Sequence, residues 1–157
     1  MKKILFVCTG NSCRSPMAEA IAKARMPRSW RARVAVSSAG TAAADGTGAA
    51  GNAVLVLKEA GIDLSGHRAR QLTVEMVREA DLVVAMADSH AGEILLLDPA
   101  AEGKVMVLGE LDGSRADPDV PDPIGGDVET YRRIRDDIAS LVDRLIDYCV
   151  DIFGLTK

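Results

Sequence analysis

The sequence has few of the residues on which metal sites and disulfide frameworks depend. It contains two histidines and three cysteines, Cys8, Cys13 and Cys149. Cys8 and Cys13 are spaced wrongly for a zinc knuckle, so we expect no metal site. An odd number of cysteines without framework spacing fits a reducing environment, which predicts a cytoplasmic protein.

Long apolar runs and an excess of positive charge are also missing. No apolar run approaches the roughly 20 residues of a membrane span, and the N-terminal residues show no signal-peptide pattern. The formal net charge is -4, which argues against non-specific binding to nucleic acid. We therefore expect neither a membrane nor a nucleic-acid partner. The length suits one domain, residues 1–157.

Apolar segments of two kinds alternate along the chain. Short runs typical of strands alternate with longer stretches typical of helices, which predicts an α/β fold. We expect a three-layer domain, a four-stranded parallel sheet with helices on both faces. Strands are expected at 3–7, 34–38, 82–86 and 105–108, and helices at 16–25, 52–59, 74–79, from 89 or 90 to 97, and at 128–149. Pro16 is expected to open the first helix, and Asp88 or Ser89 to cap the fourth.

The loop between the first strand and the first helix has the features of an anion site. Free N–H groups and the positive dipole end of the helix attract anions there. Gly10 allows a positive φ and Asn11 tolerates the left-handed region, as a concave loop requires. The residues that we expect to bind an oxyanion are Thr9, Gly10, Asn11, Ser12, Cys13, Arg14 and Ser15.

Two residues turn this anion site into a candidate reactive site. Cys8 precedes the loop, and a nest of N–H groups beside an arginine favours its thiolate form, which is a nucleophile. Arg14 offers a planar fork for two oxygens of a phosphoryl group, and Ser15 can donate a hydrogen bond to the sulfur. The alternative is a buried cysteine at a strand end beside a surface arginine.

Attack by a thiolate on a phosphoryl group requires a proton for the leaving atom. A carboxylic acid can supply that proton. The irregular stretch 109–126 offers Asp112, Asp117, Asp119 and Asp122, and their spacing does not choose among them. Each could also be a solvated turn residue or a helix cap.

The stretch C-T-G-N-S-C-R-S-P-M-A-E-A resembles the signature of the low-molecular-weight protein tyrosine phosphatases. That family includes bacterial phosphoarginine phosphatases and thioredoxin-coupled arsenate reductases. The resemblance implies hydrolysis of a phosphorylated protein or peptide side chain through a cysteinyl phosphate, without a cofactor. V-P-D-P-I-G-G resembles the acid loop of the family, which implies Asp122 as general acid. The hydrogen-bond network that supports the phosphate loop would be formed by Asn11, Ser15, Ser38 and His67.

The resemblance leaves three questions open. Cys13 could form a reversible disulfide with Cys8, or it could simply pack under the loop. An arsenate reductase would need two further cysteines near the third strand, where this chain has none. A non-catalytic phosphate-binding module would need neither the nucleophile nor Asp122.

The substrate is the last open point. The tyrosine-specific members of this family look to have an apolar residue four positions after the nucleophile. Aromatic side chains line their substrate pocket and stack on the phenol ring. This chain has Ser12 at that place and Ile124 after the acid, with no aromatic residue between Trp30 and Tyr131. The phosphoarginine phosphatases have a polar threonine there. Ser12 and Ile124 are therefore the expected specificity residues, and both phosphoarginine and phosphotyrosine are candidate substrates.

Overall fold

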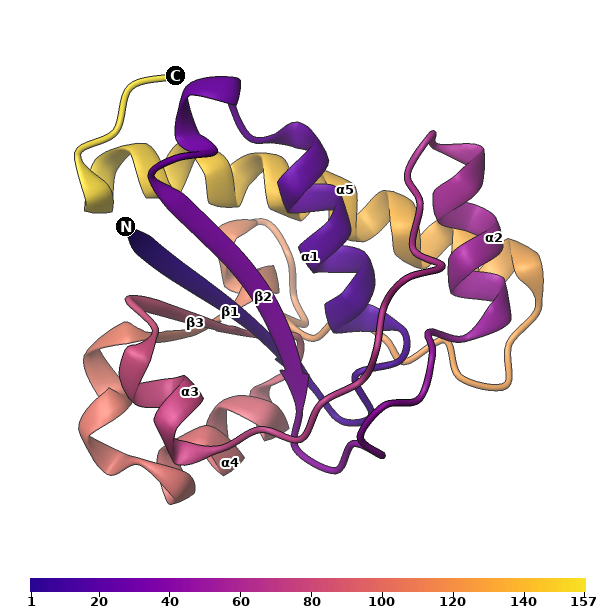
Figure 1. The fold of residues 1–157 in the computed structure, drawn as a ribbon, viewed down its shortest axis with the longest axis horizontal. Coiled ribbons are helices and arrows are strands. Elements are labelled where there is room, and N and C mark those ends of the chain that lie inside the picture. Colours follow the sequence, from indigo (N-terminus) through magenta and orange to yellow (C-terminus); the bar gives the residue numbers. More distant parts are fainter.

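The fold is a parallel sheet between two layers of helices (Figure 1). This computed structural model describes residues 1–157. The four strands lie in the order β2-β1-β3-β4, and all three pairings are parallel. The predicted fold class is therefore confirmed. The strands are β1 (Lys2–Cys8), β2 (Val34–Gly40), β3 (Leu82–Ala85) and β4 (Val105–Val107).

Helices cover both faces of the sheet. Figure 1 shows α1, α2 and α5 over one face and α3 and α4 over the other. None of the helices is both long and apolar enough to cross a membrane. The helices are α1 (Arg14–Arg25), α2 (Gly51–Glu59), α3 (Val74–Glu79), α4 (Asp88–Leu97) and α5 (Val128–Phe153), with short 3₁₀ helices η1 (Arg28–Trp30), η2 (Pro99–Lys104) and η3 (Leu108–Leu111).

The central strand β1 is buried from both sides. Side chains of a strand alternate between its faces, so Ile4 and Phe6 join the core under α1, α2 and α5. Leu5 and Val7 join the smaller core under α3 and α4. Because β1 is buried and paired on both edges, its end at Cys8 is a rigid platform for the loop that follows.

Two predicted helix starts differ from the structure. Helix α1 begins at Arg14 and not at Pro16. Pro16 is tolerated within the first turn because the N–H groups of that turn have no acceptor within the helix, so the N–H that proline lacks is not missed. Neither Asp88 nor Ser89 caps α4. Ala87 holds the cap position without a side-chain bond. The first N–H of this helix, that of Asp88, instead donates to the carboxylate of Asp119 at 2.7 Å.

The remaining boundaries shift by a few residues. Strand β2 continues past Ser38 to Gly40, and α5 continues to Phe153. The structure also contains the three 3₁₀ helices, which the sequence reading did not predict. One of them, η3, occupies the start of the stretch that we expected to be irregular.

Candidate active site

The loop after β1 is shaped by Asn11 and by the end of β2. Asn11 takes a left-handed conformation with φ 52°, whereas Gly10 has no positive φ, contrary to expectation. Asparagine tolerates this region because its short polar side chain bonds locally. Gly40 lets β2 approach the loop closely. A Cβ at that position would lie 2.4 Å from the carbonyl oxygen of Thr9.

Cys8 lies at the base of this loop and is 3% exposed. Its sulfur is 2.8 Å from the hydroxyl oxygen of Ser15. The amide nitrogen of Asn11 donates to the hydroxyls of both Ser15 and Ser38, each at 2.9 Å. The nucleophile candidate and three of the expected support residues therefore form one connected buried cluster.

His67 completes the expected set from outside the loop. Its Nε2 lies 2.8 Å from the carbonyl oxygen of Asn11. A carbonyl only accepts hydrogen bonds, so Nε2 carries the hydrogen. The structure thus brings together all four residues that the sequence analysis assigned to the support network.

Two further residues of the network were not predicted from the sequence. The backbone N–H of Arg70 donates to the side-chain oxygen of Asn11 at 3.0 Å, and the hydroxyl of Ser38 donates to a carboxylate oxygen of Glu19 at 2.7 Å. Glu19 stands in the quoted signature, but no spacing rule links it to Ser38. Arg70 acts through its backbone, which leaves no signal in the sequence.

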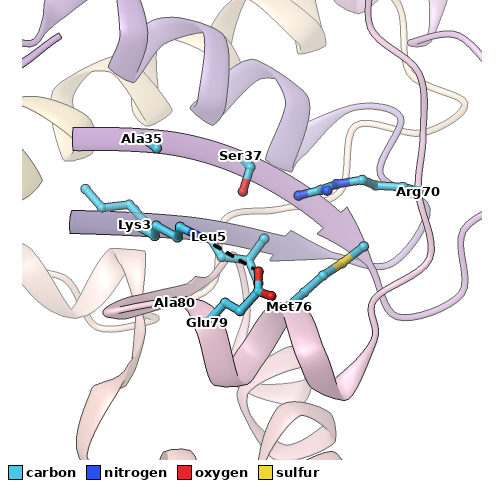
Figure 2. Close-up of a pocket in the computed structure, with 9 residues that line it drawn as sticks. Lys3, Leu5, Ala35, Ser37, Arg70, Met76, Glu79 and Ala80 are labelled. Carbon is cyan, nitrogen blue, oxygen red and sulfur yellow. Dashed lines mark ion pairs between the residues drawn. The ribbon is translucent and has the colours of Figure 1, made fainter. Parts of the chain in front are cut away.

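Arg70 also borders a hollow on the face of the sheet that carries α3 (Figure 2). Its guanidinium lies along this hollow, and its Nε donates to the carbonyl oxygen of Ser38 at 2.8 Å. The cavity measures about 240 Å³ and contains none of the predicted site residues. It is lined by Lys3, Ile4, Leu5, Ala35, Ser37, Arg70, Met76, Glu79 and Ala80.

Arg14 and Asp122 contact each other between the phosphate loop and the acid loop. Arg14 is 7% exposed, and its Nη1 donates to the carbonyl oxygen of Val120 at 3.2 Å. Its Nη2 lies 3.5 Å from the carboxylate of Asp122. This carboxylate also accepts the N–H of Ile124 at 3.1 Å, so the acid loop lies against the phosphate loop.

The other three aspartates of the stretch 109–126, which we call the acid loop as a whole, have other partners. The carboxylates of Asp112 and Asp117 each accept a backbone N–H from two residues further on, and Asp119 binds the start of α4. Among the four candidates, Asp122 is the one whose carboxylate pairs with Arg14. The geometry therefore favours the same residue as the family resemblance.

A buried histidine contacts the first residue of the loop. His90 is 2% exposed, and its Nε2 lies 2.8 Å from the hydroxyl of Thr9, while its Nδ1 has no partner. Burial, and then the positive charge of Arg14, lower the pKa of His90. The sequence analysis missed this residue because its only signal is a histidine after a strand.

All three cysteines are free thiols. The sulfur of Cys13 lies 3.3 Å from the hydroxyl of Tyr131, at the start of α5. Cys149 is buried in the core beside α1 and β1, where burial raises the pKa of its thiol to about 12. This thiol therefore stays protonated near neutral pH, which makes it a poor partner for redox chemistry at the loop.

The two expected specificity residues lie on different loops. Ile124 is 66% exposed beside the acid candidate. Ser12 is half-buried, and its carbonyl oxygen accepts the N–H of Ala50 at 2.9 Å, which ties the phosphate loop to the start of α2. The structure thus exposes an aliphatic side chain, and no aromatic one, on the acid loop.

Comparisons with known proteins agree with this architecture. The family model "Low molecular weight phosphotyrosine protein phosphatase" matches residues 3–150. A protein-arginine-phosphatase from Geobacillus stearothermophilus is 43% identical over 145 residues, which cover 92% of this chain and 94% of that protein. A probable low molecular weight protein-tyrosine-phosphatase, EpsP, from Ralstonia solanacearum is 37% identical and covers 94% of this chain and 92% of its own length.

Solved structures give the same result. The YwlE arginine phosphatase from Geobacillus stearothermophilus superimposes with a TM-score of 0.88 at 39% identity, covering 100% of this chain and 99% of its own. A low molecular weight protein tyrosine phosphatase from T. tengcongensis gives a TM-score of 0.84 at 41% identity, with 94% and 99% covered.

Fold and relatives together define a protein phosphatase, an enzyme of the phosphoric monoester hydrolase class. The chain belongs to the low molecular weight phosphotyrosine protein phosphatase family. These relatives give no support to the alternatives of an arsenate reductase or a non-catalytic phosphate-binding module.

Proposed function

We propose that this phosphatase removes the phosphoryl group from phosphoarginine in proteins, through a phosphate carried on Cys8. The observation that carries the proposal is the convergence of three groups on one loop. The thiol of Cys8 lies at its base, Arg14 closes it, and the carboxylate of Asp122 lies 3.5 Å from that arginine. A nucleophile, an oxyanion ligand and a proton donor are what phosphoryl transfer to a thiol requires.

The first step transfers the phosphoryl group to sulfur. The N–H groups of residues 9–15 and the Arg14 guanidinium hold the phosphoryl oxygens. The Cys8 thiolate attacks phosphorus, an S–P bond forms, and the P–N bond to the arginine breaks. The leaving nitrogen takes its proton from the carboxylic acid of Asp122.

The second step releases phosphate. The Asp122 carboxylate takes a proton from a water molecule, the water oxygen attacks phosphorus, and the S–P bond breaks to regenerate the Cys8 thiolate. Asp122 is suited to both steps because its side chain is 44% exposed and can contact water. The solved structure of a YwlE cysteine-to-serine mutant, 38% identical to this chain, has a phosphorylated active-site serine. That finding supports a covalent intermediate here.

Several features favour phosphoarginine. The protein-arginine-phosphatase of Geobacillus stearothermophilus is 43% identical to this chain. Neither the acid loop nor the loop after β2 has an aromatic side chain to stack on a phenol ring. A hydroxyl at Ser12 can hydrogen-bond the guanidinium, and the carboxyl group of Asp122 can hydrogen-bond it as well.

Phosphotyrosine is the second candidate. The probable protein-tyrosine-phosphatase EpsP of Ralstonia nicotianae is 45% identical over 112 residues, 71% of this chain. A phenol ring could pack on the exposed Ile124 without a stacking partner. The P–O bond would then break in place of the P–N bond, with the same roles for Cys8, Arg14 and Asp122.

The test is a comparison of kcat/KM on two peptides of one sequence, one with phosphoarginine and one with phosphotyrosine. We expect a preference for phosphoarginine that Ser12→Ile reduces. Turnover of nitrophenyl phosphate, which carries no guanidinium, should survive the substitution and serves as the control. A preference for phosphotyrosine in the wild type would contradict the substrate assignment and leave the reaction class unchanged.

We further propose that residues 1–157 act as one domain in the reducing cytoplasm. The larger core joins β1 and β2 to α1, α2 and α5, and it includes Leu155 near the C-terminus. A nucleophilic Cys8 requires a reduced thiol, and all three cysteines are free.

A further inference from the structure

The side chain of Arg115 joins the acid loop to α5. Its Nη1 and Nη2 donate to the two carboxylate oxygens of Asp137 at 2.7 and 2.8 Å, a two-point ion pair. The same guanidinium donates to the carbonyl oxygen of Asp117 at 2.7 Å and to that of Asp119 at 3.0 Å. One side chain therefore binds two loop carbonyls and a helix carboxylate at once.

The opposite side of the loop is anchored to the sheet. The N–H of Val120 donates to the carbonyl oxygen of Met86, just after β3, at 2.8 Å. Val120 is fully buried, and its own carbonyl oxygen accepts from Arg14. The segment 117–120 is thus fixed between the sheet and α5, and Arg115 supplies the fixing on the α5 side.

Asp122 depends on this upstream anchoring. It follows Val120 by two residues, and its carboxylate has only the N–H of Ile124 and the 3.5 Å contact with Arg14. These two contacts would not hold the Asp122 carboxylate in place if the backbone of residues 117–120 moved. A displacement of about 1 Å in a catalytic group can cost on the order of 100-fold in rate.

We infer that Arg115 is a positioning residue, which holds the acid loop so that Asp122 lies over the phosphate loop. The inference rests on the proposed role of Asp122 as general acid. Arginine suits this place because four acceptors in fixed directions need the donors of a planar fork. A lysine has three donors on a single nitrogen and can satisfy only part of the set.

The experiment compares Arg115→Met and Arg115→Lys with Arg25→Met as a matched control. Arg25 also pairs with a carboxylate of α5, that of Asp143 at 2.7 Å, but it has no contact with the acid loop. Two readouts are needed. Hydrogen exchange of the amides at 117–122, which are those of Asp117, Asp119, Val120 and Asp122, reports whether the loop is held. The kcat/KM on phenyl phosphate and on nitrophenyl phosphate, which reports transfer of the phosphoryl group to Cys8, shows whether the acid is placed.

In Arg115→Met we expect faster exchange at 117–122 and a selective loss of kcat/KM on phenyl phosphate, about tenfold, because a poor leaving group needs its proton most. The kcat/KM on nitrophenyl phosphate and competitive inhibition by vanadate should change little, since the phosphate loop is intact. Arg115→Lys should fall between Arg115→Met and the wild type, and Arg25→Met should match the wild type.

Asp137→Asn provides a second variant should Arg115→Met fail to fold. It leaves Arg115 its two carbonyl contacts and removes the ion pair, so both readouts should shift in the same direction by less. Unchanged exchange at 117–122 in the variants that fold would overturn the inference, and so would equal losses on the two substrates.

Asp122→Ala, measured alongside, separates the inference from the proposed function. If Asp122→Ala is selective for phenyl phosphate while the Arg115 variants are not, the positioning role alone fails. If Asp122→Ala shows no selectivity, the general-acid role fails and the inference fails with it.

Discussion

The hydroxyl oxygen of Ser15 lies 2.8 Å from the sulfur of Cys8. The direction of this hydrogen bond follows from its neighbours. The N–H of Arg70 donates to the side-chain oxygen of Asn11, which turns the NH₂ group of Asn11 toward Ser15 and Ser38. Ser15 accepts there, so its own hydrogen is free to point at the sulfur. The network thus presents an O–H donor to the thiolate.

Ser15→Ala should slow turnover by removing this donor. Hydrogen bonds to charged groups contribute about 1.5–3 kcal/mol, which corresponds to a loss of roughly 10- to 100-fold in kcat/KM. Steady-state kinetics on nitrophenyl phosphate measure the effect, with Ser89→Ala, an exposed serine of α4, as control. Wild-type kinetics in Ser15→Ala would show that the thiolate does not need this hydroxyl.

Gly109→Ala should destabilise the protein, because Gly109 lies against the backbone of the acid loop. A Cβ there would lie 1.9 Å from the carbonyl oxygen of Pro118, so the loop or η3 must move. Overpacking of this kind costs about 1–3 kcal/mol and more where backbone shifts. Urea unfolding measures the change in the free energy of unfolding.

Gly92→Ala is the matched control for that substitution. Gly92 lies within α4, and a Cβ there would meet no atom within 4 Å. Alanine in a helix interior is favoured over glycine by about 0.5–1 kcal/mol, so this variant should be more stable than the wild type. Equal stabilities for the two variants would contradict the close packing of the acid loop on Gly109.

His90 should make stability depend on pH. Burial and the charge of Arg14 lower its pKa from 6.5, and Glu93, Asp119 and Asp122 oppose the shift. A histidine with a lowered pKa is neutral in the folded protein and becomes protonated more readily when unfolded. The contribution of the neutral His90 to the free energy of unfolding is therefore complete above pH 6.5. It is lost as the pH falls through the lowered pKa that His90 has in the folded protein.

His90→Gln tests this dependence, since glutamine can still hydrogen-bond the hydroxyl of Thr9 but does not titrate. The free energy of unfolding, measured in urea between about pH 7 and pH 5, should fall more steeply for the wild type than for the variant. All other residues are the same in both proteins, so the difference in slope isolates His90. Parallel curves would contradict a neutral buried histidine.

Local patterns were enough to predict the sheet and the phosphate loop. Each strand is an apolar run, and the residues from Cys8 to Ser15 are contiguous, so their types and spacing carry the information. The choice of Asp122 needed the resemblance to the family, because four aspartates in one loop look alike until the fold places one beside Arg14.

Long-range contacts could not be predicted in this way. Gly40, Arg70 and Arg115 act on parts of the chain that only the fold brings near them, and Arg70 does so partly through its backbone. We expected the loop to use the left-handed region at Gly10 and at Asn11, since both residue types tolerate it, and the structure uses it only at Asn11. The hydrogen bonds of the Asn11 side chain are available only at one of these positions.

The most direct test of the account is to capture the phosphate on Cys8. Asp122→Ala should slow release of the intermediate, because no carboxylate remains to take a proton from water. After a denaturing quench during turnover of nitrophenyl phosphate, mass spectrometry of the peptides should find phosphate on Cys8 and none on Cys13 or Cys149. Turnover with no phosphate on Cys8, or with phosphate on another residue, would contradict the proposed mechanism.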